Sequence, residues 1–122
     1  VLRHEIVLKA SFTLDSGPRE EGEERISEII KWRRENQPGG HNAGSVFMNP
    51  PDDSAGRLIE EAGLKGYRVG SAQVSEKHAN FIQVEKNGSA DDIYQLMIEV
   101  KSEVEKHAGI SLQTETIMIG FD

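Results

Sequence analysis

The segment from Ala90 to Ala108 constrains the fold most, because it carries the clearest helical pattern in the chain. Its apolar side chains recur every three or four residues, which places them on one face of a helix. That stripe consists of Ile93, Leu96, Met97, Val100 and Val104. Ser89 with Asp92 resembles a capping box at the start, and Gly109 is a stop signal at the end. The sequence therefore predicts one helix over about 90–108.

Two further helices are predicted. The segment from Glu20 to Asn36 has acidic first turns and a basic end, which complement the helix dipole, and its isoleucines share one face. A shorter helix is predicted from about Ser54 to Ala62, where Asp53 or Ser54 can cap the start and Gly63 the end.

Other segments have the patterns of strands. Residues 4–14 alternate most regularly between apolar and polar, 81–84 and 111–119 read as two more strands, and short extended pieces flank Gly70. Residues 41–53 read as loops around a short apolar stretch. Helices and strands are mixed without regular alternation, which predicts an α+β fold: a small mixed or antiparallel sheet packed against helices, preceded by one strand and a helix from a domain junction.

The composition narrows the class of protein. The chain has 122 residues, enough for one domain with a modest core. Its formal net charge of −7 argues against nucleic-acid binding, and no apolar run is long enough to span a bilayer. Cysteine is absent, and the four histidines lack the spacing of a helical zinc site. We expect a cytoplasmic protein without a metal site and without a nucleic-acid or membrane partner.

Two features could carry chemistry. The polar loop Asn42–Pro51 can present a hydroxyl and an amide to a ligand, and a plain connecting loop is an equal alternative. Glu115 shares strand parity with Ile117 and Ile119 and points to their face. If that face is the core, desolvation favours the protonated carboxyl; if the strand lies at an edge, the side chain reaches water. The residues alone favour the edge slightly.

Four blocks resemble, in order, those of one known family. They are Ala43–Pro50 (AGSVFMNP), Ser54–Gly66 (SAGRLIEEAGLKG), Ser75–Ile82 (SEKHANFI) and Leu112–Glu115 (LQTE) with Ile119–Gly120, after a lead-in of Arg33, Arg34, Gln37 and Pro38. The chain thereby resembles the C-terminal part of the UDP-N-acetylenolpyruvoylglucosamine reductase (UDP-N-acetylmuramate dehydrogenase, MurB) family, in its shorter form without insertions. Four blocks in one order are far more specific than any single motif.

The resemblance implies an oxidoreductase of peptidoglycan biosynthesis. The family reduces UDP-N-acetylglucosamine enolpyruvate to UDP-N-acetylmuramate; NADPH reduces FAD, and reduced FAD passes a hydride to the vinyl group. By the same resemblance, Ser45 donates the proton that must follow, and Glu115 stabilises the enol or assists proton delivery. A neutral hydroxyl can serve as the acid because the intermediate is itself strongly basic. Asn49 and His78 match positions that line the substrate site.

The resemblance also divides the chain. Residues 1–17 look like the tail strand of an FAD-binding domain, 18–40 like a connecting helix and linker, and 41–122 like the C-terminal substrate-binding domain. The expected partners are the enolpyruvyl substrate and that FAD-binding domain. FAD and NADPH are expected in the full-length enzyme, and neither is expected to bind this chain alone. Met48 departs from the family, because lysine or arginine is common there.

A function of another class is the alternative: a stand-alone, non-catalytic module that keeps the nucleotide-sugar pocket as a binding or interaction surface. The start at Val1 and the first strand without a partner favour a fragment of the reductase. The presence of both Ser45 and Glu115 argues against long relaxation of an active site. We therefore expect the substrate-binding part of the reductase, inactive by itself.

Overall fold

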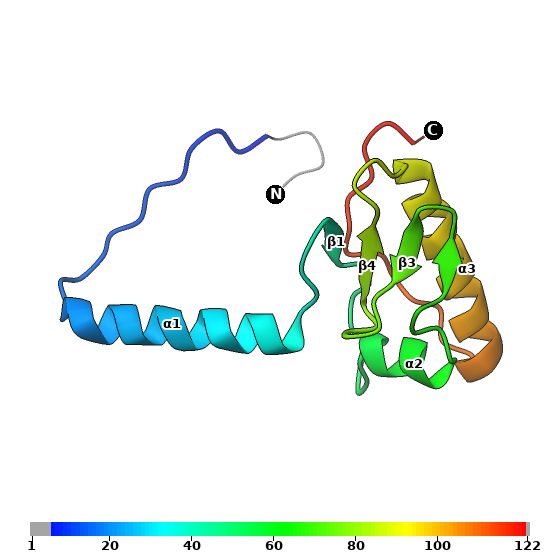
Figure 1. Cartoon of the computed structure of the whole chain (residues 1–122), viewed down its shortest axis with the longest axis horizontal. Coiled ribbons are helices and arrows are strands. Elements are labelled where there is room, and N and C mark those ends of the chain that lie inside the picture. Colours follow the sequence, from blue (N-terminus) through cyan, green and yellow to red (C-terminus); the bar gives the residue numbers. More distant parts are fainter. Residues whose placement is uncertain (1–5, 122) are drawn as a thin grey trace. The chain divides into compact units, whose positions relative to one another are not determined.

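The computed structural model describes residues 6–121, which form three helices and a four-stranded antiparallel sheet. In chain order the elements are α1 (Arg19–Asn36), β1 (Asn42–Ser45), α2 (Ala55–Glu61), β2 (Arg68–Val69), β3 (Ala72–Val74), β4 (Phe81–Val84) and α3 (Ala90–Ala108) (Figure 1). The predicted α+β class is confirmed. The chain divides into two compact units, Val1–Lys31 and Trp32–Asp122. None of the helices in the described part of the chain is long and apolar enough to cross a membrane.

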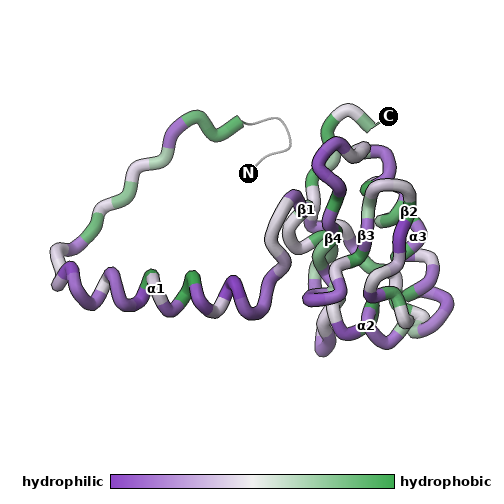
Figure 2. The backbone as a smooth tube through the Cα atoms, in the orientation of Figure 1, coloured by the Kyte–Doolittle hydropathy of each residue, from purple (hydrophilic) through white to green (hydrophobic). Residues whose placement is uncertain are grey.

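The first unit consists of an extended segment followed by most of α1. The helix confirms the prediction for 20–36, with acidic residues in its first turn and basic residues in its last. The predicted strand over 4–14 is wrong where the structure describes it, because residues 6–14 form no regular structure. Ile6 is 85% exposed and Leu8 92%, and Figure 2 shows the hydrophobic stretches of this segment. An extended segment becomes a strand only when a neighbour pairs with its N–H and C=O groups. Residues 4 and 5 lie outside the described residues.

The second unit contains the whole sheet, in the order β1-β4-β3-β2. Strands β2 and β3 confirm the short extended pieces that flank Gly70, and β4 confirms the strand at 81–84. The prediction of loops over 41–53 is wrong at β1, which pairs antiparallel with β4. The polar, glycine-containing sequence of β1 has little strand character of its own, so its pairing with β4 decides its conformation.

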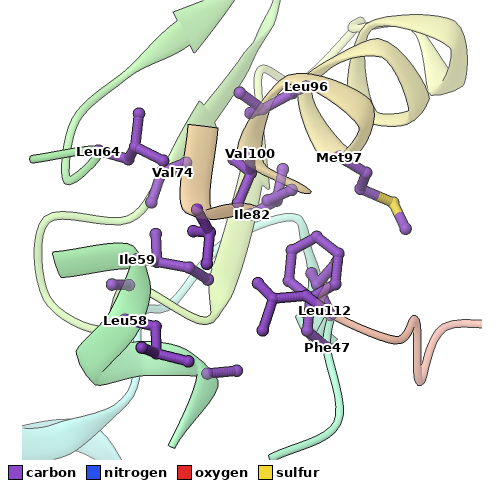
Figure 3. Packing of buried hydrophobic residues seen from close by; sticks show 14 of the residues in the cluster. Phe47, Leu58, Ile59, Leu64, Val74, Ile82, Leu96, Met97, Val100 and Leu112 are labelled. Carbon is purple, nitrogen blue, oxygen red and sulfur yellow. The ribbon is translucent and has the colours of Figure 1, made fainter. Parts of the chain in front are cut away.

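The core of this unit lies where α3 packs against β2 and β3 and where α2 meets α3. The apolar stripe predicted for α3 supplies four buried residues, Leu96, Met97, Val100 and Val104, while Ile93 is half-buried. Helix α2 adds Leu58 and Ile59, and the close-up of the core shows Phe47 beside Leu112 (Figure 3). The core therefore joins α2, α3 and the sheet to the segments that contain Phe47 and Leu112.

The C-terminal segment corrects a second strand prediction. Residues 111–119 form no strand and contribute one isolated bridge, between Phe47 and Thr114. Ile117 is 85% exposed and Ile119 87%, so the face that they share with Glu115 is not the core. Glu115 is itself exposed, so its side chain reaches water, as in the alternative reading, although no strand places it at a sheet edge. Parity shows which side chains share a face but not whether another layer covers that face.

The start of α3 corrects the predicted capping box. The Ser89 hydroxyl accepts a hydrogen bond from the Asp91 N–H (3.1 Å), as expected of an N-cap. The Asp92 carboxylate does not reach back to Ser89; one of its oxygens accepts from the Ser71 N–H (2.8 Å) and from the Ser71 hydroxyl (2.6 Å). Ser71 lies in the turn between β2 and β3, so a tertiary contact replaces the local one. The stop at Gly109 is confirmed by its left-handed conformation, φ 69°.

Candidate active-site segment around Ser45

The direction of Ser45 depends on an irregularity in β1. Asn42 pairs with Gln83 and Ser45 pairs with Phe81, so three steps along β1 correspond to two along β4. This extra residue is a β-bulge, and Gly44 provides the left-handed conformation (φ 70°) that such bulges favour. Directly paired residues share a sheet face, so the bulge brings Asn42 and Ser45 to the same face; a regular strand would place them on opposite faces. Ser45 is exposed there.

The residues after Ser45 are held by Asn80. The Val46 N–H donates to the Asn80 carbonyl (3.0 Å). The Asn80 side-chain oxygen accepts from the Phe47 N–H (3.0 Å), and its side-chain nitrogen donates to the Phe47 carbonyl (2.8 Å). Val46 and Phe47 are fully buried, so the segment is fixed both by packing and by hydrogen bonds.

The C-terminal segment forms backbone hydrogen bonds with Val46 and Met48. The Glu115 N–H donates to the Val46 carbonyl (2.9 Å), and the Met48 N–H donates to the Gln113 carbonyl (2.9 Å). The Glu115 backbone therefore lies directly beside the residue that follows Ser45. Both Ser45 and Glu115 are exposed, so the Glu115 side chain does not face the core.

Asn49 and His78 lie at the start of α2. The Asn49 side-chain oxygen accepts from the Ala55 N–H (3.0 Å), which ties the loop after the Ser45 segment to the first turn of the helix. A Cβ atom at Gly56 would lie 3.3 Å from His78 Cε1, so the imidazole packs closely against the helix backbone. The His78 ring also meets the Phe81 ring edge-on at 4.9 Å. Phe81 is also the residue that pairs with Ser45 in the sheet.

His78 also borders a cavity of about 260 Å³ with several charged neighbours. Its lining consists of Ser54, Gly56, Arg57, Glu60, Lys65, Lys77, His78 and Ala79. Lys65 is paired with Glu60 at 2.8 Å, whereas Lys77 donates to the backbone carbonyl of Arg34. Among the described residues no carboxylate forms an ion pair with Lys77, and a carbonyl oxygen does not neutralise its charge, so the ammonium group can attract an anion.

Arg57 in the same cavity is held by two carboxylates of its own helix region. It is paired with Asp53 and with Glu61, each four residues away. The hydrogen bond from Arg57 and the one from the Ser54 N–H lower the pKa of Asp53 to about 2, and the hydrogen bond to Asp53 raises the pKa of Arg57. The guanidinium is thus oriented at the rim of the cavity with most of its charge balanced.

The structure brings the four predicted site residues together in two pairs. Ser45 and Glu115 lie on neighbouring backbone segments, and Asn49 and His78 lie against the start of α2. The prediction from sequence did not single out Asn80 or Lys77, although both belong to the SEKHANFI block. Their burial and contacts depend on the tertiary fold. Within residues 6–121, no group of three or more His, Asp or Glu side chains is placed to bind a metal ion.

The helices and the antiparallel sheet that carry the segments around Ser45 define an α+β domain. The family model for "UDP-N-acetylenolpyruvoylglucosamine reductase, C-terminal domain" matches residues 36–119. The chain belongs to this family, as its sequence predicts.

Curated and solved relatives agree with this assignment. The UDP-N-acetylenolpyruvoylglucosamine reductase of Clostridium beijerinckii is 45% identical over 118 residues, which are 96% of this chain and 39% of the relative. That of Geotalea uraniireducens is 46% identical over 119 residues, 97% of this chain and 40% of the relative. The crystal structure of the reductase (MurB) from Thermus caldophilus matches with a TM-score of 0.72 and 40% identity, covering 86% of this chain and 37% of that one. The chain thus spans about two fifths of the length of these relatives.

Proposed function

We propose that this chain is the C-terminal, substrate-binding part of a bacterial, cytoplasmic UDP-N-acetylenolpyruvoylglucosamine reductase. In the complete enzyme it would help convert UDP-N-acetylglucosamine enolpyruvate into UDP-N-acetylmuramate, with NADPH and FAD as cofactors. The single observation that best supports this proposal is the hydrogen bond from the Glu115 N–H to the Val46 carbonyl (2.9 Å). This bond joins the backbone of Glu115, the residue proposed to stabilise the enol or assist proton delivery, to the residue that follows Ser45, the proposed proton donor. The two segments are about 70 residues apart in the chain.

Ser45 would protonate the reduced enolpyruvyl carbon. Its hydroxyl is exposed on the strand face to which the bulge at Gly44 turns it, where a ligand can reach it. A positioned general acid contributes about a hundred- to ten-thousand-fold to the rate. Glu115 would stabilise the enol, by a hydrogen bond from its protonated carboxyl to the developing charge, or would assist proton delivery.

Asn49, His78 and the cavity beside α2 would bind the nucleotide-sugar part of the substrate. The cavity of about 260 Å³ presents Lys77 together with the paired cations Arg57 and Lys65. Cations at such a site attract a diphosphate even though the chain as a whole is acidic. Met48 is exposed and uncharged, so any basic contact in this region would come from the cavity.

The described residues do not fit FAD. Two cavities on the described residues measure about 290 Å³ each, at or below the lower end of pockets for drug-sized ligands, roughly 300–1,000 Å³, and FAD is larger than most such ligands. The proposal therefore assigns FAD binding to the part of the longer reductase that precedes this segment, which would also be the partner of this chain. The roles proposed for Ser45 and Glu115 concern only the proton.

Substitution of Ser45 in the longer reductase that carries this segment tests the proposal. We expect Ser45→Ala to leave reduction of the flavin by NADPH unchanged and to slow reduction of the enolpyruvyl substrate by about a hundred-fold or more. Stopped-flow absorbance separates the two half-reactions. Ser102→Ala, at an exposed position of α3, is the matched control. An unchanged substrate half-reaction in Ser45→Ala would remove Ser45 from the role of proton donor.

A further inference from the structure

Asn80 is one of two polar residues that the structure buries among its described residues. Its side chain is only 5% exposed, and Ser75 is the other, at 1%. A buried amide costs stability unless its donor and acceptor are both paired. The hydrogen-bond partners of the Asn80 amide therefore indicate its role in the structure.

The Asn80 amide pairs with a single residue in both directions. Its oxygen accepts from the Phe47 N–H (3.0 Å), and its nitrogen donates to the Phe47 carbonyl (2.8 Å). This is the pattern that a neighbouring strand would provide, supplied here by one side chain. With the Asn80 carbonyl accepting from the Val46 N–H (3.0 Å), three hydrogen bonds fix the two residues that follow Ser45.

The backbone of Asn80 also fixes His78. The Asn80 N–H donates to His78 Nδ1 (3.2 Å). A neutral imidazole that accepts at Nδ1 carries its proton at Nε2, which makes Nε2 a hydrogen-bond donor. One residue thus holds the segment of Ser45 and the ring of His78, although it touches neither the Ser45 hydroxyl nor the cavity.

We infer that Asn80 is a positioning residue, which aligns Ser45 for proton donation through the two-way hydrogen bonding of its side chain with Phe47. The inference rests on the proposed function, because alignment matters only if Ser45 transfers a proton. Leucine would fill the same buried space but would leave the Phe47 N–H and carbonyl unpaired. Position 80 therefore requires a side chain that both donates and accepts a hydrogen bond, and a side chain of the same size without these groups is not sufficient.

Asn80→Asp in the longer reductase that carries this segment provides the test. The introduced carboxyl keeps the shape of the amide, and when protonated it can still donate to the Phe47 carbonyl and accept from the Phe47 N–H. Once ionised, the carboxylate can only accept hydrogen bonds, and one of its oxygens then repels the Phe47 carbonyl oxygen. We expect kcat of the substrate half-reaction to fall about ten- to a hundred-fold as pH rises, with a smaller change in KM. Reduction of the flavin by NADPH should not change with the substitution.

Two further variants complete the design. Asn87→Asp introduces the same charge at an exposed turn and should leave the pH profile as in the wild type. Asn80→Leu should show the loss at every pH. A measurement on the 122-residue chain is independent of activity. The protection of the Phe47 amide proton, which is the intrinsic exchange rate divided by the observed rate at the same pH, should fall as pH rises in Asn80→Asp and not in Asn87→Asp.

The outcomes separate the inference from the proposed function. A wild-type rate with an unchanged pH profile in Asn80→Asp, or equal losses in both half-reactions, overturns the positioning role while Ser45 keeps its own. Protection of the Phe47 amide proton that is the same in Asn80→Asp and Asn87→Asp at every pH overturns it as well. If the wild-type reductase fails to reduce the enolpyruvyl substrate, or Ser45→Ala retains full activity, the proposed function fails, and the alignment of Ser45 fails with it.

Discussion

At the scale of single residues, the candidate site depends on backbone pairing more than on side-chain contacts. Ser45 reaches its face because one residue is inserted into β1 against β4, and Glu115 comes beside it because its N–H bonds to Val46. Both side chains are exposed in this chain. Their proposed chemistry therefore depends on the ligand that would cover them.

Glu115→Gln tests the second proposed role. The amide keeps the shape and a hydrogen-bond donor but loses the titratable proton. We expect the variant to fold normally, because Glu115 is exposed, and to slow the substrate half-reaction by about a hundred-fold or more if the carboxyl acts in proton delivery. Stopped-flow absorbance of the longer reductase measures this rate, and Glu105→Gln on α3 is the control. A rate within two-fold of wild type, roughly the spread among neutral surface changes, would make Glu115 an ordinary surface acid.

Asp92 predicts a pH dependence of stability. The hydrogen bonds from the Ser71 hydroxyl and the Ser71 N–H hold the pKa of Asp92 below its ordinary value. A lowered folded-state pKa stabilises the fold above the ordinary range of aspartate, about pH 4, and this contribution is lost as pH falls through the folded-state pKa. We expect the wild type to exceed Asp92→Asn in Tm at pH 6, and the difference to shrink towards pH 2. Asp91→Asn, in the same first turn, controls for the helix dipole, and a difference independent of pH would contradict the assignment.

At the scale of elements, the start of α3 is joined to the turn between β2 and β3. Ser71 donates to Asp92 and its hydroxyl accepts from the Ser89 N–H (2.9 Å), so one serine links the helix cap to the sheet. Gly88, just before this cap, lies in the same crowded region. The packing there leaves no room for a further atom.

Gly88→Ala is expected to destabilise the fold. A Cβ at Gly88 would lie 2.3 Å from Val84 Cγ2 and 2.6 Å from Ser71 Oγ, so the backbone or the Ser71 contacts must shift. Overpacking of this kind costs about 1–3 kcal/mol. Urea unfolding of the 122-residue chain measures the change in the free energy of unfolding. Gly39→Ala, where a Cβ meets nothing within 4 Å, should change it little. Equal stabilities of the two variants would show that the turn adapts without cost.

At the scale of the whole molecule, the chain carries one part of what its relatives carry. It spans 39% of the Clostridium beijerinckii reductase and 40% of that from Geotalea uraniireducens. Apolar side chains of 6–14 and of the C-terminal segment are exposed in the described structure, whereas the core of the second unit is closed around α2, α3 and the sheet. The division predicted at residues 17 and 40 stays a prediction.

The 122-residue chain alone is expected to bind no FAD and to have no reductase activity, because three cavities on its described residues, of about 260 to 290 Å³, are too small for the flavin. After incubation with FAD and gel filtration, the protein peak should show no flavin absorbance. The full-length reductase of Clostridium beijerinckii, treated in the same way, is the comparison. A stoichiometric flavin complex of the chain would contradict the assignment of FAD binding to the preceding part.

The sequence by itself determined the elements whose signals are local. Caps, stop signals and apolar periodicity set the three helices to within a residue or two, and the four ordered blocks identified the family. The strands flanking Gly70 and the strand at 81–84 also followed from short-range patterns. These features could be predicted because each depends on residues a few positions apart.

Only the tertiary structure decided which extended segments find partners. Residues 6–14 alternate regularly and residues 111–119 also read as a strand, yet neither segment forms one. The polar β1 becomes a strand because β4 pairs with it. The same holds for the site: the bulge that turns Ser45, the bidentate contact of Asn80 with Phe47 and the exposure of Glu115 all arise from segments far apart in the chain. Hydrogen-bond partners in a sheet are non-local, so alternation along one segment cannot reveal whether a partner exists.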